Sequence, residues 1–252
     1  MDDDKTLQVT RAILNARNAV AITGAGISTE AGIPDFRSPG SGLWTKMSPI
    51  LFTRWGFRFR PRTLYALGQQ FFKDIWNAES TVAHTFLALL EEKGILKGII
   101  TQNVDNLHQK AGSKRVLEVH GHLRTGTCLK CKRVYPMEEV MVKLNDKGEL
   151  PPRCDKCRKA IKPDVVLFGD PLPRRLYKEA IALVRGCDLL LILGSSLVVY
   201  PVANLPKLAL RNRAKVIIMN LQPTPYDRLA HIVVHKPLGQ FCQGVIDRIE
   251  GV

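Results

Sequence analysis

Four cysteines in this chain are spaced as metal ligands. Cys128 and Cys131 form one Cys-x-x-Cys pair, and Cys154 and Cys157 form a second pair after a gap of 22 residues. Two such pairs are typical of a tetrahedral zinc site. Disulfides are the alternative, but they are rare in cytoplasmic proteins, and a redox motif needs only one pair. Because four thiolates leave no open coordination position, we predict a structural zinc ion, without which this small module would not fold.

A glycine-rich stretch could bind phosphate. Residues 23–37 read Thr-Gly-Ala-Gly-Ile-Ser-Thr-Glu-Ala-Gly-Ile-Pro-Asp-Phe-Arg and follow an apolar run at 19–22. Gly24 and Gly26 let a phosphate approach the main chain, and a following helix capped by Ser28 or Thr29 would offer free N–H groups to an anion. An ordinary strand-to-helix turn is the alternative. It does not explain why a rigid turn, an anion, an aromatic ring and a cation follow at 34–37.

The spacing of these glycines argues against two common nucleotide sites. Five residues separate Gly26 from Gly32, where the dehydrogenase fingerprint has two, and no Gly-Lys-Ser or Gly-Lys-Thr ending marks a P-loop. The stretch is therefore a phosphate turn of another kind.

The elements around these motifs alternate between strand and helix. The apolar, β-branched runs are 19–22, 98–101, 116–120, 164–168, 188–193, 215–219 and 232–234, and helical patterns cover 7–17, 80–93, 176–184, 203–211 and 241–249. This order predicts an α/β fold, a Rossmann-like doubly wound parallel sheet. Ligands bind such sheets at the carboxyl ends of the strands, where polar clusters occur in this sequence at 23–25, 102–105, 120–121, 194–196 and 220–221.

Two stretches interrupt the alternation. Residues 38–77 are rich in Pro, Gly, Arg and aromatic side chains, and residues 124–163 contain the four paired cysteines. We predict a discontinuous Rossmann-like domain at 1–37, 78–123 and 164–252, a loop and helical insertion at 38–77, and a zinc-binding module with a short helix at 138–144.

The charge is strongly positive, with 37 Lys and Arg against 23 Asp and Glu and a net charge of +14. Such a balance favours acidic partners, including substrates associated with nucleic acid. The longest apolar run is too short to cross a membrane, and the acidic N-terminus is unlike a secretory signal. We therefore expect a cytoplasmic protein without a membrane partner.

Taken together, the motifs resemble one family. They are Gly24 to Ser28, Pro34 to Arg37, Gln102 to Asp105, His120-Gly121, the paired cysteines, Phe168-Gly169, Gly194 to Ser196 and Asn220-Leu221. The set resembles the sirtuins, which are NAD-dependent protein-lysine deacylases. The likeness extends from about Ala19 to Leu238 in the order of the family, so it covers nearly the whole chain.

The resemblance implies an NAD site at the carboxyl edge of the sheet, with the zinc ribbon and the helical segment together forming a smaller domain over the cleft. Its diphosphate contacts would be Gly24, Ala25, Gly26, Ile27, Ser28 and Thr29, and Asp35, Phe36 and Arg37 would lie at the nicotinamide end. Gln102 and Asn103 would contact the ribose, and Val104 and Asp105 would hold the carboxamide. The adenosine half would meet Gly194, Ser195, Ser196, Asn220, Leu221, Gln222 and Leu238. Because NAD would be consumed, no hydride is transferred.

The resemblance also implies the chemistry, in which His120 and Asn103 are the catalytic residues. Nicotinamide is a cationic leaving group, so the weakly nucleophilic acyl oxygen of acyl-lysine can attack the anomeric carbon of the ribose. His120 would then act as general base on a ribose hydroxyl, a task suited to a group that titrates near neutral pH. His122 is the alternative base on the same strand. The other histidines, at 84, 108, 231 and 235, we interpret as structural.

The expected partner is an acetylated lysine of a protein or peptide, bound as an added strand, which is a sequence-tolerant mode. The resemblance places this strand against Val165, Phe168, Gly169 and Val198. Tyr65 is followed three residues later by Gly68, where members that prefer acidic acyl groups carry arginine, so we expect acetyl or another neutral acyl group. Asp170 and Leu167 depart from the glutamate and the aromatic residue that are common at their positions.

Residues 54–62 interleave aromatic rings with arginines. We predict a lid over the NAD site whose alternation points the rings inward and leaves the arginines in water. Two other functions remain open on the sequence. One is a protein ADP-ribosyltransferase that uses the same NAD site, and the other is a basic zinc-ribbon protein that binds nucleic acid. We expect a monomer.

Overall fold

The strand β1 (Ala19–Thr23) lies inside a six-stranded parallel sheet, and all five of its residues are buried. The computed structural model describes residues 2–38, 40, 42–46 and 48–251. Strand order is β3-β2-β1-β7-β8-β9, with β2 (Leu96–Thr101), β3 (Val116–Glu118), β7 (Leu189–Leu193), β8 (Lys215–Met219) and β9 (Ile232–Val234). The chain runs outward from β1 to β3 on one side and resumes at β7 on the other. The ends of β1 and β7 therefore mark the point where ligands bind in such sheets.

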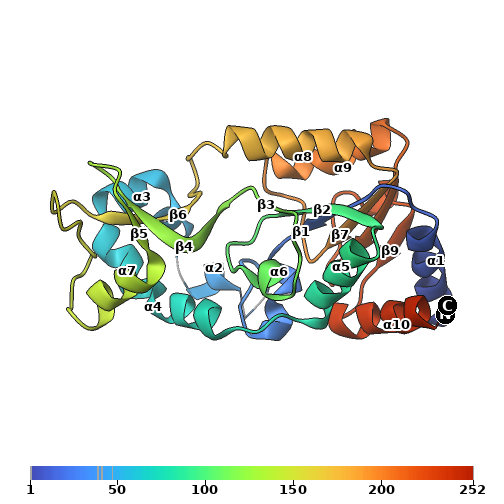
Figure 1. Cartoon of the computed structure of the whole chain (residues 1–252), viewed down its shortest axis with the longest axis horizontal. Coiled ribbons are helices and arrows are strands. Elements are labelled where there is room, and N and C mark those ends of the chain that lie inside the picture. The colour runs from blue at the N-terminus through green and yellow to red at the C-terminus, as the bar shows by residue number, and fades with distance from the viewer. Residues whose placement is uncertain (1, 39, 41, 47, 252) are drawn as a thin grey trace.

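Helices cover both faces of this sheet (Figure 1). One face carries α1 (Asp2–Leu14), α5 (Val82–Glu92) and α10 (Leu238–Glu250), and the other carries α8 (Arg174–Gly186) and α9 (Leu205–Arg211). Alternate strand residues supply the two cores: Ala21 and Leu191 belong to the first core, and Ile22 and Ile192 to the second. This division follows from the two-residue period of a strand. The predicted doubly wound α/β fold is confirmed.

A smaller lobe lies at the opposite end of the molecule from α1 and α10 (Figure 1). Its antiparallel sheet has the order β5-β4-β6, with β4 (Gly121–Cys128), β5 (Val134–Pro136) and β6 (Ile161–Val165). The helices of the lobe are α3 (Arg54–Phe59), α4 (Pro61–Asn77) and α7 (Met137–Asn145). The short helix α2 (Leu43–Lys46) precedes them in the chain, and α6 (Leu107–Lys110) follows β2. Short 3-10 turns are η1 (Ala25–Ile27), η2 (Thr29–Ala31), η3 (Pro49–Phe52), η4 (Val202–Asn204) and η5 (Asp227–Leu229). One shared core joins the helical segment and the zinc module into this lobe.

The predicted strand at 164–168 does not belong to the main sheet. The structure has β6 at Ile161–Val165, paired with β4 in the small sheet, and β4 begins at Gly121. The small sheet therefore extends past both ends of the predicted 124–163 module. A short β-branched run looks alike in either sheet, since only its pairing partners distinguish them. Residues 1 and 252 of the first predicted domain, and 39, 41 and 47 of the second, lie outside the described residues.

The predicted inward alternation of rings in the lid is also wrong. Residues 54–59 form the helix α3, so Trp55 and Phe59 are four residues apart on one face and stack with ring centroids 5.8 Å apart. Both rings are exposed, at 64% and 71%, and only Phe57 is buried. We expected side chains to alternate between two sides, as in an extended segment, but in a helix they repeat every 3.6 residues, so the rings do not all point inward.

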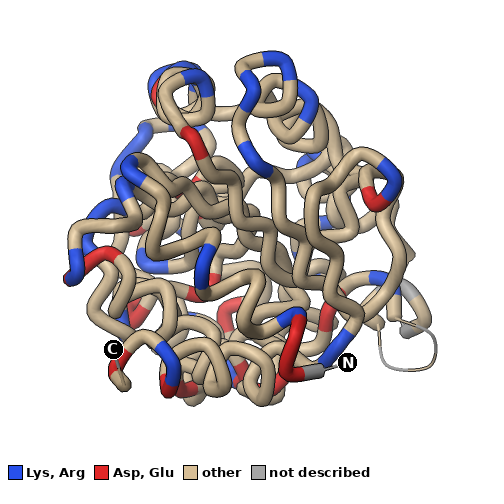
Figure 2. Tube along the Cα trace, turned by 90° about the vertical axis from the view of Figure 1, so that its right-hand side faces the viewer, with Lys and Arg blue, Asp and Glu red and all other residues tan. Residues whose placement is uncertain are grey.

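Basic residues are spread over the view in Figure 2 and outnumber the acidic ones there. The excess charge thus covers much of the surface rather than a single segment. Within the described part of the chain, no helix is both long enough and apolar enough to span a membrane.

Candidate active site

A cavity of about 1030 Å³ lies at the carboxyl ends of the main-sheet strands and continues beneath the smaller lobe. It brings together nearly all the predicted site residues. These are Gly24, Ala25, Gly26, Ser28, Thr29, Asp35, Phe36, Arg37, Gln102, Asn103, Val104, Asp105, His120, Val165, Phe168, Gly169, Gly194, Ser195, Ser196, Asn220, Leu221, Gln222 and Leu238. Two predicted NAD or substrate residues are not in the lining: Ile27 is buried in the core, and Val198 is exposed beside the lining residues Val199 and Tyr200.

The glycine turn after β1 packs directly on the turn after β7. A Cβ on Gly26 would lie 2.8 Å from the Cα of Gly194, and a Cβ on Gly194 would lie 2.3 Å from the main-chain nitrogen of Ile27. Gly194 also has a φ of +62°, which glycine adopts without strain. Close packing between the two turns therefore requires these glycines, in addition to any approach by phosphate.

The helix expected after this turn is absent among residues 24–32, which form the 3-10 turns η1 and η2 instead. Neither Ser28 nor Thr29 caps a helix, because the Ser28 side chain points to Asp105 and the Thr29 hydroxyl donates to the Gly26 carbonyl. A phosphate would therefore meet the main chain of two short 3-10 turns, and not the N-terminus of a long helix.

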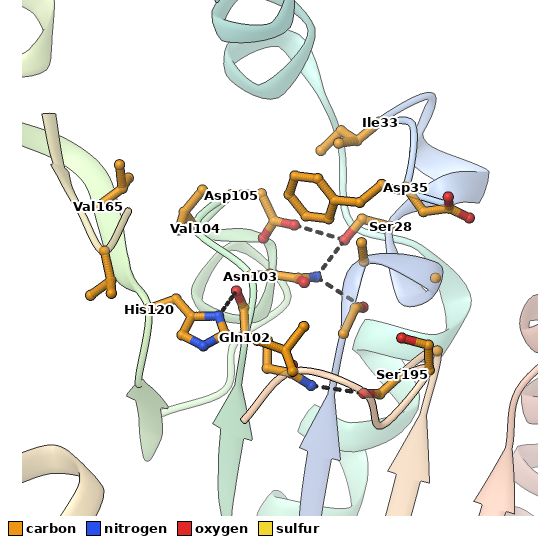
Figure 3. A pocket seen from close by; sticks show the side chains of 18 of the residues that line it. Ser28, Ile33, Asp35, Gln102, Asn103, Val104, Asp105, His120, Val165 and Ser195 are labelled. Atoms are coloured by element: carbon orange, nitrogen blue, oxygen red, sulfur yellow. Dashed lines mark hydrogen bonds between the residues drawn. The ribbon is translucent and has the colours of Figure 1, made fainter. Parts of the chain in front are cut away.

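A buried hydrogen-bonded cluster joins the ends of β1 and β2 (Figure 3). Asn103 donates its side-chain N–H groups to the Gly24 carbonyl at 3.2 Å and to the Ser28 hydroxyl at 3.1 Å. The Ser28 hydroxyl donates to the Asp105 carboxylate at 2.7 Å, and the Leu107 main-chain N–H donates to the other carboxylate oxygen at 3.0 Å. Burial raises the pKa of Asp105, and these hydrogen bonds oppose that rise. Both donors of the Asn103 amide are used, so its oxygen is the group that can meet a ligand.

His120 stands in the turn between β3 and β4, and its orientation is set by a main-chain carbonyl. Its Nδ1 lies 3.1 Å from the Gln102 oxygen (Figure 3), and a carbonyl only accepts. Nδ1 therefore carries the proton, and Nε2 is left as a base. Burial lowers the pKa of His120, although the bond to Gln102 acts in the other direction. The imidazole is thus neutral at neutral pH and able to accept a proton at Nε2.

His122, the alternative base, is not in the cavity lining.

At the polar end of the cavity, the Gln102 side chain donates to the Ser195 hydroxyl at 2.7 Å and so joins the ends of β2 and β7. Asp35 lines the cavity, but its carboxylate accepts from the main-chain N–H groups of Arg37 and Ser38. Asp35 therefore shapes its own loop, and Figure 3 shows its carboxylate directed away from Asn103.

The four paired cysteines converge in the smaller lobe, where all their sulfur atoms lie within 4.8 Å of one another. Between the two Cys-x-x-Cys pairs, the sulfur atoms of Cys128 and Cys157 are 3.3 Å apart and those of Cys131 and Cys154 are 3.5 Å apart. None of the four cysteines is in a disulfide. Sulfur ligands 2.3 Å from a tetrahedral zinc ion lie about 3.8 Å apart. The cluster therefore fits a structural zinc ion, as the spacing predicts.

Comparison with known proteins agrees with this geometry. Residues 24–201 match the model of the Sir2 family. An NAD-dependent protein deacetylase 2 of Caldanaerobacter subterraneus is 47% identical over 226 residues, covering 89% of this chain and 88% of the relative. The chain belongs to the Sir2 family. An NAD-dependent protein deacetylase of Sulfolobus acidocaldarius is 43% identical over 249 residues, covering 99% of this chain and 97% of that one.

Solved structures of Sir2 proteins have the same fold as this Sir2-family chain. One, a Sir2 variant with a deacetylated p53 peptide and 3'-O-acetyl-ADP-ribose, has a TM-score of 0.93 at 39% identity and covers 96% of this chain and 98% of that one. Another, Sir2 with a p53 peptide and NAD+, has a TM-score of 0.91 at 38% identity and covers 97% and 98%. The predicted resemblance to the sirtuins is confirmed.

The structure of this Sir2-family member adds lining residues that the sequence did not predict. Beside Gly68 and Leu167, an apolar arm of the cavity is lined by Ile33, Phe57, Leu64, Phe71, Phe72, Ile75 and Leu123. Glu30 also lines the cavity, and its carboxylate accepts from the Gly239 N–H in the first turn of α10. The amphipathic spacing along α4 could have indicated an apolar face, but not that it faces the cavity. No sequence signal pairs Glu30 with Gly239.

Proposed function

We propose that this chain removes acetyl or similar neutral acyl groups from protein lysines with NAD as co-substrate. The products are nicotinamide, the free lysine and O-acyl-ADP-ribose. The observation that carries the proposal is the placement of His120. Its basic nitrogen is left open by the Gln102 bond, in the same cavity as the glycine turn and the cluster of Ser28, Asn103 and Asp105.

The residues divide the work along the cavity. NAD, when bound, supplies an activated ribose with nicotinamide as the leaving group. The turns around Gly24 and Gly194 form the floor for the diphosphate, and Asp105, braced by Ser28, holds the carboxamide end. The Asn103 amide oxygen orients the ribose, and His120 Nε2 takes the proton of a ribose hydroxyl. No Ser-His-Asp arrangement is needed, because the hydroxyl that His120 activates belongs to the substrate.

The substrate peptide binds at the mouth of the cavity, between two loops. Phe168 and Tyr200 are exposed there, at 45% and 69%, beside the exposed Val198. The main chain of Phe168 already pairs with residues 52–54, since its N–H donates to the Phe52 carbonyl and its own carbonyl accepts from the Arg54 N–H. Both main-chain groups of Phe168 are thus in use, and Gly169 lies in the turn that follows, with a φ of +88°. The peptide therefore pairs with the main chain beside Phe168, at Gly169, rather than with Phe168 itself.

The apolar arm favours neutral acyl chains. Tyr65, the residue whose type marks acidic-acyl enzymes of the family, is fully buried, and its hydroxyl donates to the Ile161 carbonyl at 2.9 Å. Gly68 lines the arm three residues later and offers no charge to an acidic acyl group. An acidic group would lose its hydration there without a partner.

The test is a peptide assay. An acetyl-lysine peptide is incubated with the protein and NAD, and the products are identified by mass spectrometry. Free lysine together with acetyl-ADP-ribose supports deacetylation. A peptide that gains ADP-ribose would support the ADP-ribosyltransferase alternative instead. Absence of nicotinamide release would overturn the proposal. A succinylated peptide is the matched control for the acyl preference and should react more slowly.

Three expectations stay predictions. They are a cytoplasmic location, a monomeric state and substrates associated with nucleic acid, for which the net charge of +14 is the support. A steep loss of binding with added salt and no preference for base sequence would identify such nucleic-acid binding as electrostatic.

A further inference from the structure

A chain of buried hydrogen bonds runs behind the candidate active site. The main-chain N–H of Asn103 donates to the Thr101 hydroxyl oxygen at 3.0 Å, and the Thr23 hydroxyl donates to the same oxygen at 2.9 Å. The Thr23 oxygen in turn lies 2.9 Å from Nε2 of His108. These four residues are between 0% and 8% exposed. A histidine outside the cavity lining is thus connected to the residue to which we assign the orientation of the ribose.

The direction of these bonds defines the protonation of His108. Since the Thr23 hydroxyl proton is donated to Thr101, the Thr23 oxygen accepts from His108. Nε2 of His108 therefore carries the ring proton, and Nδ1 is an acceptor. That Nδ1 is buried and has no hydrogen-bond partner among the described residues.

His84 presents the complementary group. Its Nδ1 accepts from the Thr81 main-chain N–H at 3.2 Å, as part of the capping box that begins α5. The ring proton of His84 is therefore on Nε2, which is also buried without a partner among the described residues. The two rings meet edge to face with centroids 4.7 Å apart. One ring thus has an unused donor and the other an unused acceptor.

Both rings are neutral at neutral pH. Burial lowers the pKa of His84 to about 4, and burial together with the neighbouring His84 lowers the pKa of His108 well below its usual value. A charged ring would carry a proton on both nitrogens, and one of these N–H groups would be buried without an acceptor among the described residues.

We propose that His108 is a positioning residue for Asn103 that acts through Thr23 and Thr101. The Thr23 oxygen keeps the proton of His108 on Nε2, and the His84 ring packs edge to face against the His108 ring. Thr23 then donates to Thr101, whose oxygen holds the Asn103 N–H at the carboxyl end of β2. The side-chain amide of Asn103 is thereby placed where its oxygen meets the substrate. This inference rests on the proposed function.

Strand pairing alone does not require this arrangement. Thr23 and Thr101 are already paired in the sheet, and the Gln102 N–H donates to the Thr23 carbonyl at 3.0 Å. Two apolar side chains would fill the space of the histidines without the desolvation of their ring nitrogens. The side-chain hydrogen bonds also fix the main-chain N–H of Asn103, which lies beyond the last paired residues of β1 and β2.

Steady-state kinetics of four variants test the proposal. His108→Leu removes the donor to Thr23 and should lower kcat roughly tenfold to a hundredfold, because small misplacements of an orienting group have effects of that size. The KM for NAD should stay within about twofold, as expected when only transition-state interactions are lost. His108→Gln can still donate an N–H to Thr23 and should restore most of kcat. His231→Gln, at the far edge of the sheet, is the matched control. If His108→Leu does not fold, kcat of Thr101→Val is compared with that of Thr101→Ser. Only the serine variant keeps the hydroxyl that accepts from Thr23 and from the Asn103 N–H, so only the valine variant should lose kcat.

Wild-type kcat in His108→Leu, or an equal loss in the Leu and Gln variants, would overturn the proposal. Nitrogen NMR of histidine-labelled wild-type protein is a readout that needs no activity. It should show His84 and His108 both protonated on Nε2 and unchanged between about pH 6 and 8, given their lowered pKa values. A proton on Nδ1 of His108 would also overturn it. Failure of the proposed function itself would appear separately, as wild-type protein that is inactive toward acetyl peptide.

Discussion

The Ser28 hydroxyl donates a hydrogen bond of 2.7 Å to the Asp105 carboxylate, which joins the turn after β1 to the turn after β2. The two side chains are 1% and 6% exposed. The same hydroxyl accepts from the Asn103 amide, so a single buried oxygen connects the residue assigned to the ribose with the residue assigned to the carboxamide.

Ser28→Ala should therefore affect both stability and NAD binding. The change leaves one Asp105 oxygen and one Asn103 N–H without their partner, and a buried polar group without a partner costs about 1–3 kcal/mol. We expect the free energy of unfolding in urea to fall by that amount and the Kd for NAD to rise. Thr85→Ala, which lies outside the cavity lining and loses only an exposed bond to the Val82 carbonyl, is the control. A Ser28→Ala protein with unchanged unfolding and NAD affinity would contradict this role.

His120→Ala should lower kcat by at least about a hundredfold, the usual contribution of a general base, while the Kd for NAD stays nearly unchanged. The pH profile follows from the lowered pKa of His120. As the pH falls through that pKa, Nε2 becomes protonated and can no longer accept the ribose proton. Wild-type kcat/KM should thus be at its plateau at pH 7 and decline on the acid side, with an apparent pKa below 6.5. An acid limb well above pH 7 would argue for another base.

Gly194→Ala should be strongly destabilising. The new methyl group would lie 2.3 Å from the Ile27 nitrogen at a residue whose φ is +62°. Strained backbone of this kind costs on the order of 1–3 kcal/mol before the clash is added. Gly186→Ala is the matched control, because a Cβ there meets nothing within 4 Å. Urea unfolding should separate the two variants, and equal stabilities would show that the two turns do not pack as described.

Removal of zinc should unfold the smaller lobe. Structural zinc sites contribute about 10–16 kcal/mol to the folding of small modules. Here the cysteines would tie the end of β4 to the segment that precedes β6. We expect a strong chelator, or Cys154→Ser, to abolish metal content by elemental analysis and to expose 121–165 to proteolysis. Cys187→Ala lies outside the cluster and should keep its zinc. Resistance of the metal-free protein to proteolysis would contradict a structural role.

The buried His84 predicts a loss of stability in acid. Its folded-state pKa is about 4, against 6.5 for the ordinary side chain. The unfolded chain therefore binds a proton that the folded one does not, so stability is full above about pH 6.5 and falls as the pH drops toward 4. The difference corresponds to about 3 kcal/mol. In His84→Gln this part of the decline should disappear from urea unfolding curves measured between pH 7 and 4. A decline of equal steepness in that variant would assign it to other groups.

Much of the site was predictable because its chemistry depends on local spacing. The glycine turn, the Gln-Asn-x-Asp cluster and the two Cys-x-x-Cys pairs each lie within a few residues, directly after a strand or within a knuckle. The carboxyl ends of parallel strands meet at one edge, so the clusters converge wherever the strands are assigned correctly. The predictions for 164–168 and for the rings of 54–62 were wrong because these stretches depend on distant segments. Pairing with β4 decided the sheet of the first, and a helical period instead of an alternating one decided the direction of the rings in the second.

The sequence by itself thus determined the family, the α/β class and the four cysteines that fit a zinc ion, and it predicted His120 as the base. Only the tertiary structure decided how those groups are held. It aimed the Gln102 carbonyl at Nδ1 of His120 and placed Gly194 against Gly26. It also brought His84 and His108 together behind Asn103. Such contacts join residues from different strands and helices, and their geometry depends on the twist and register of the whole sheet, which no short stretch of sequence encodes.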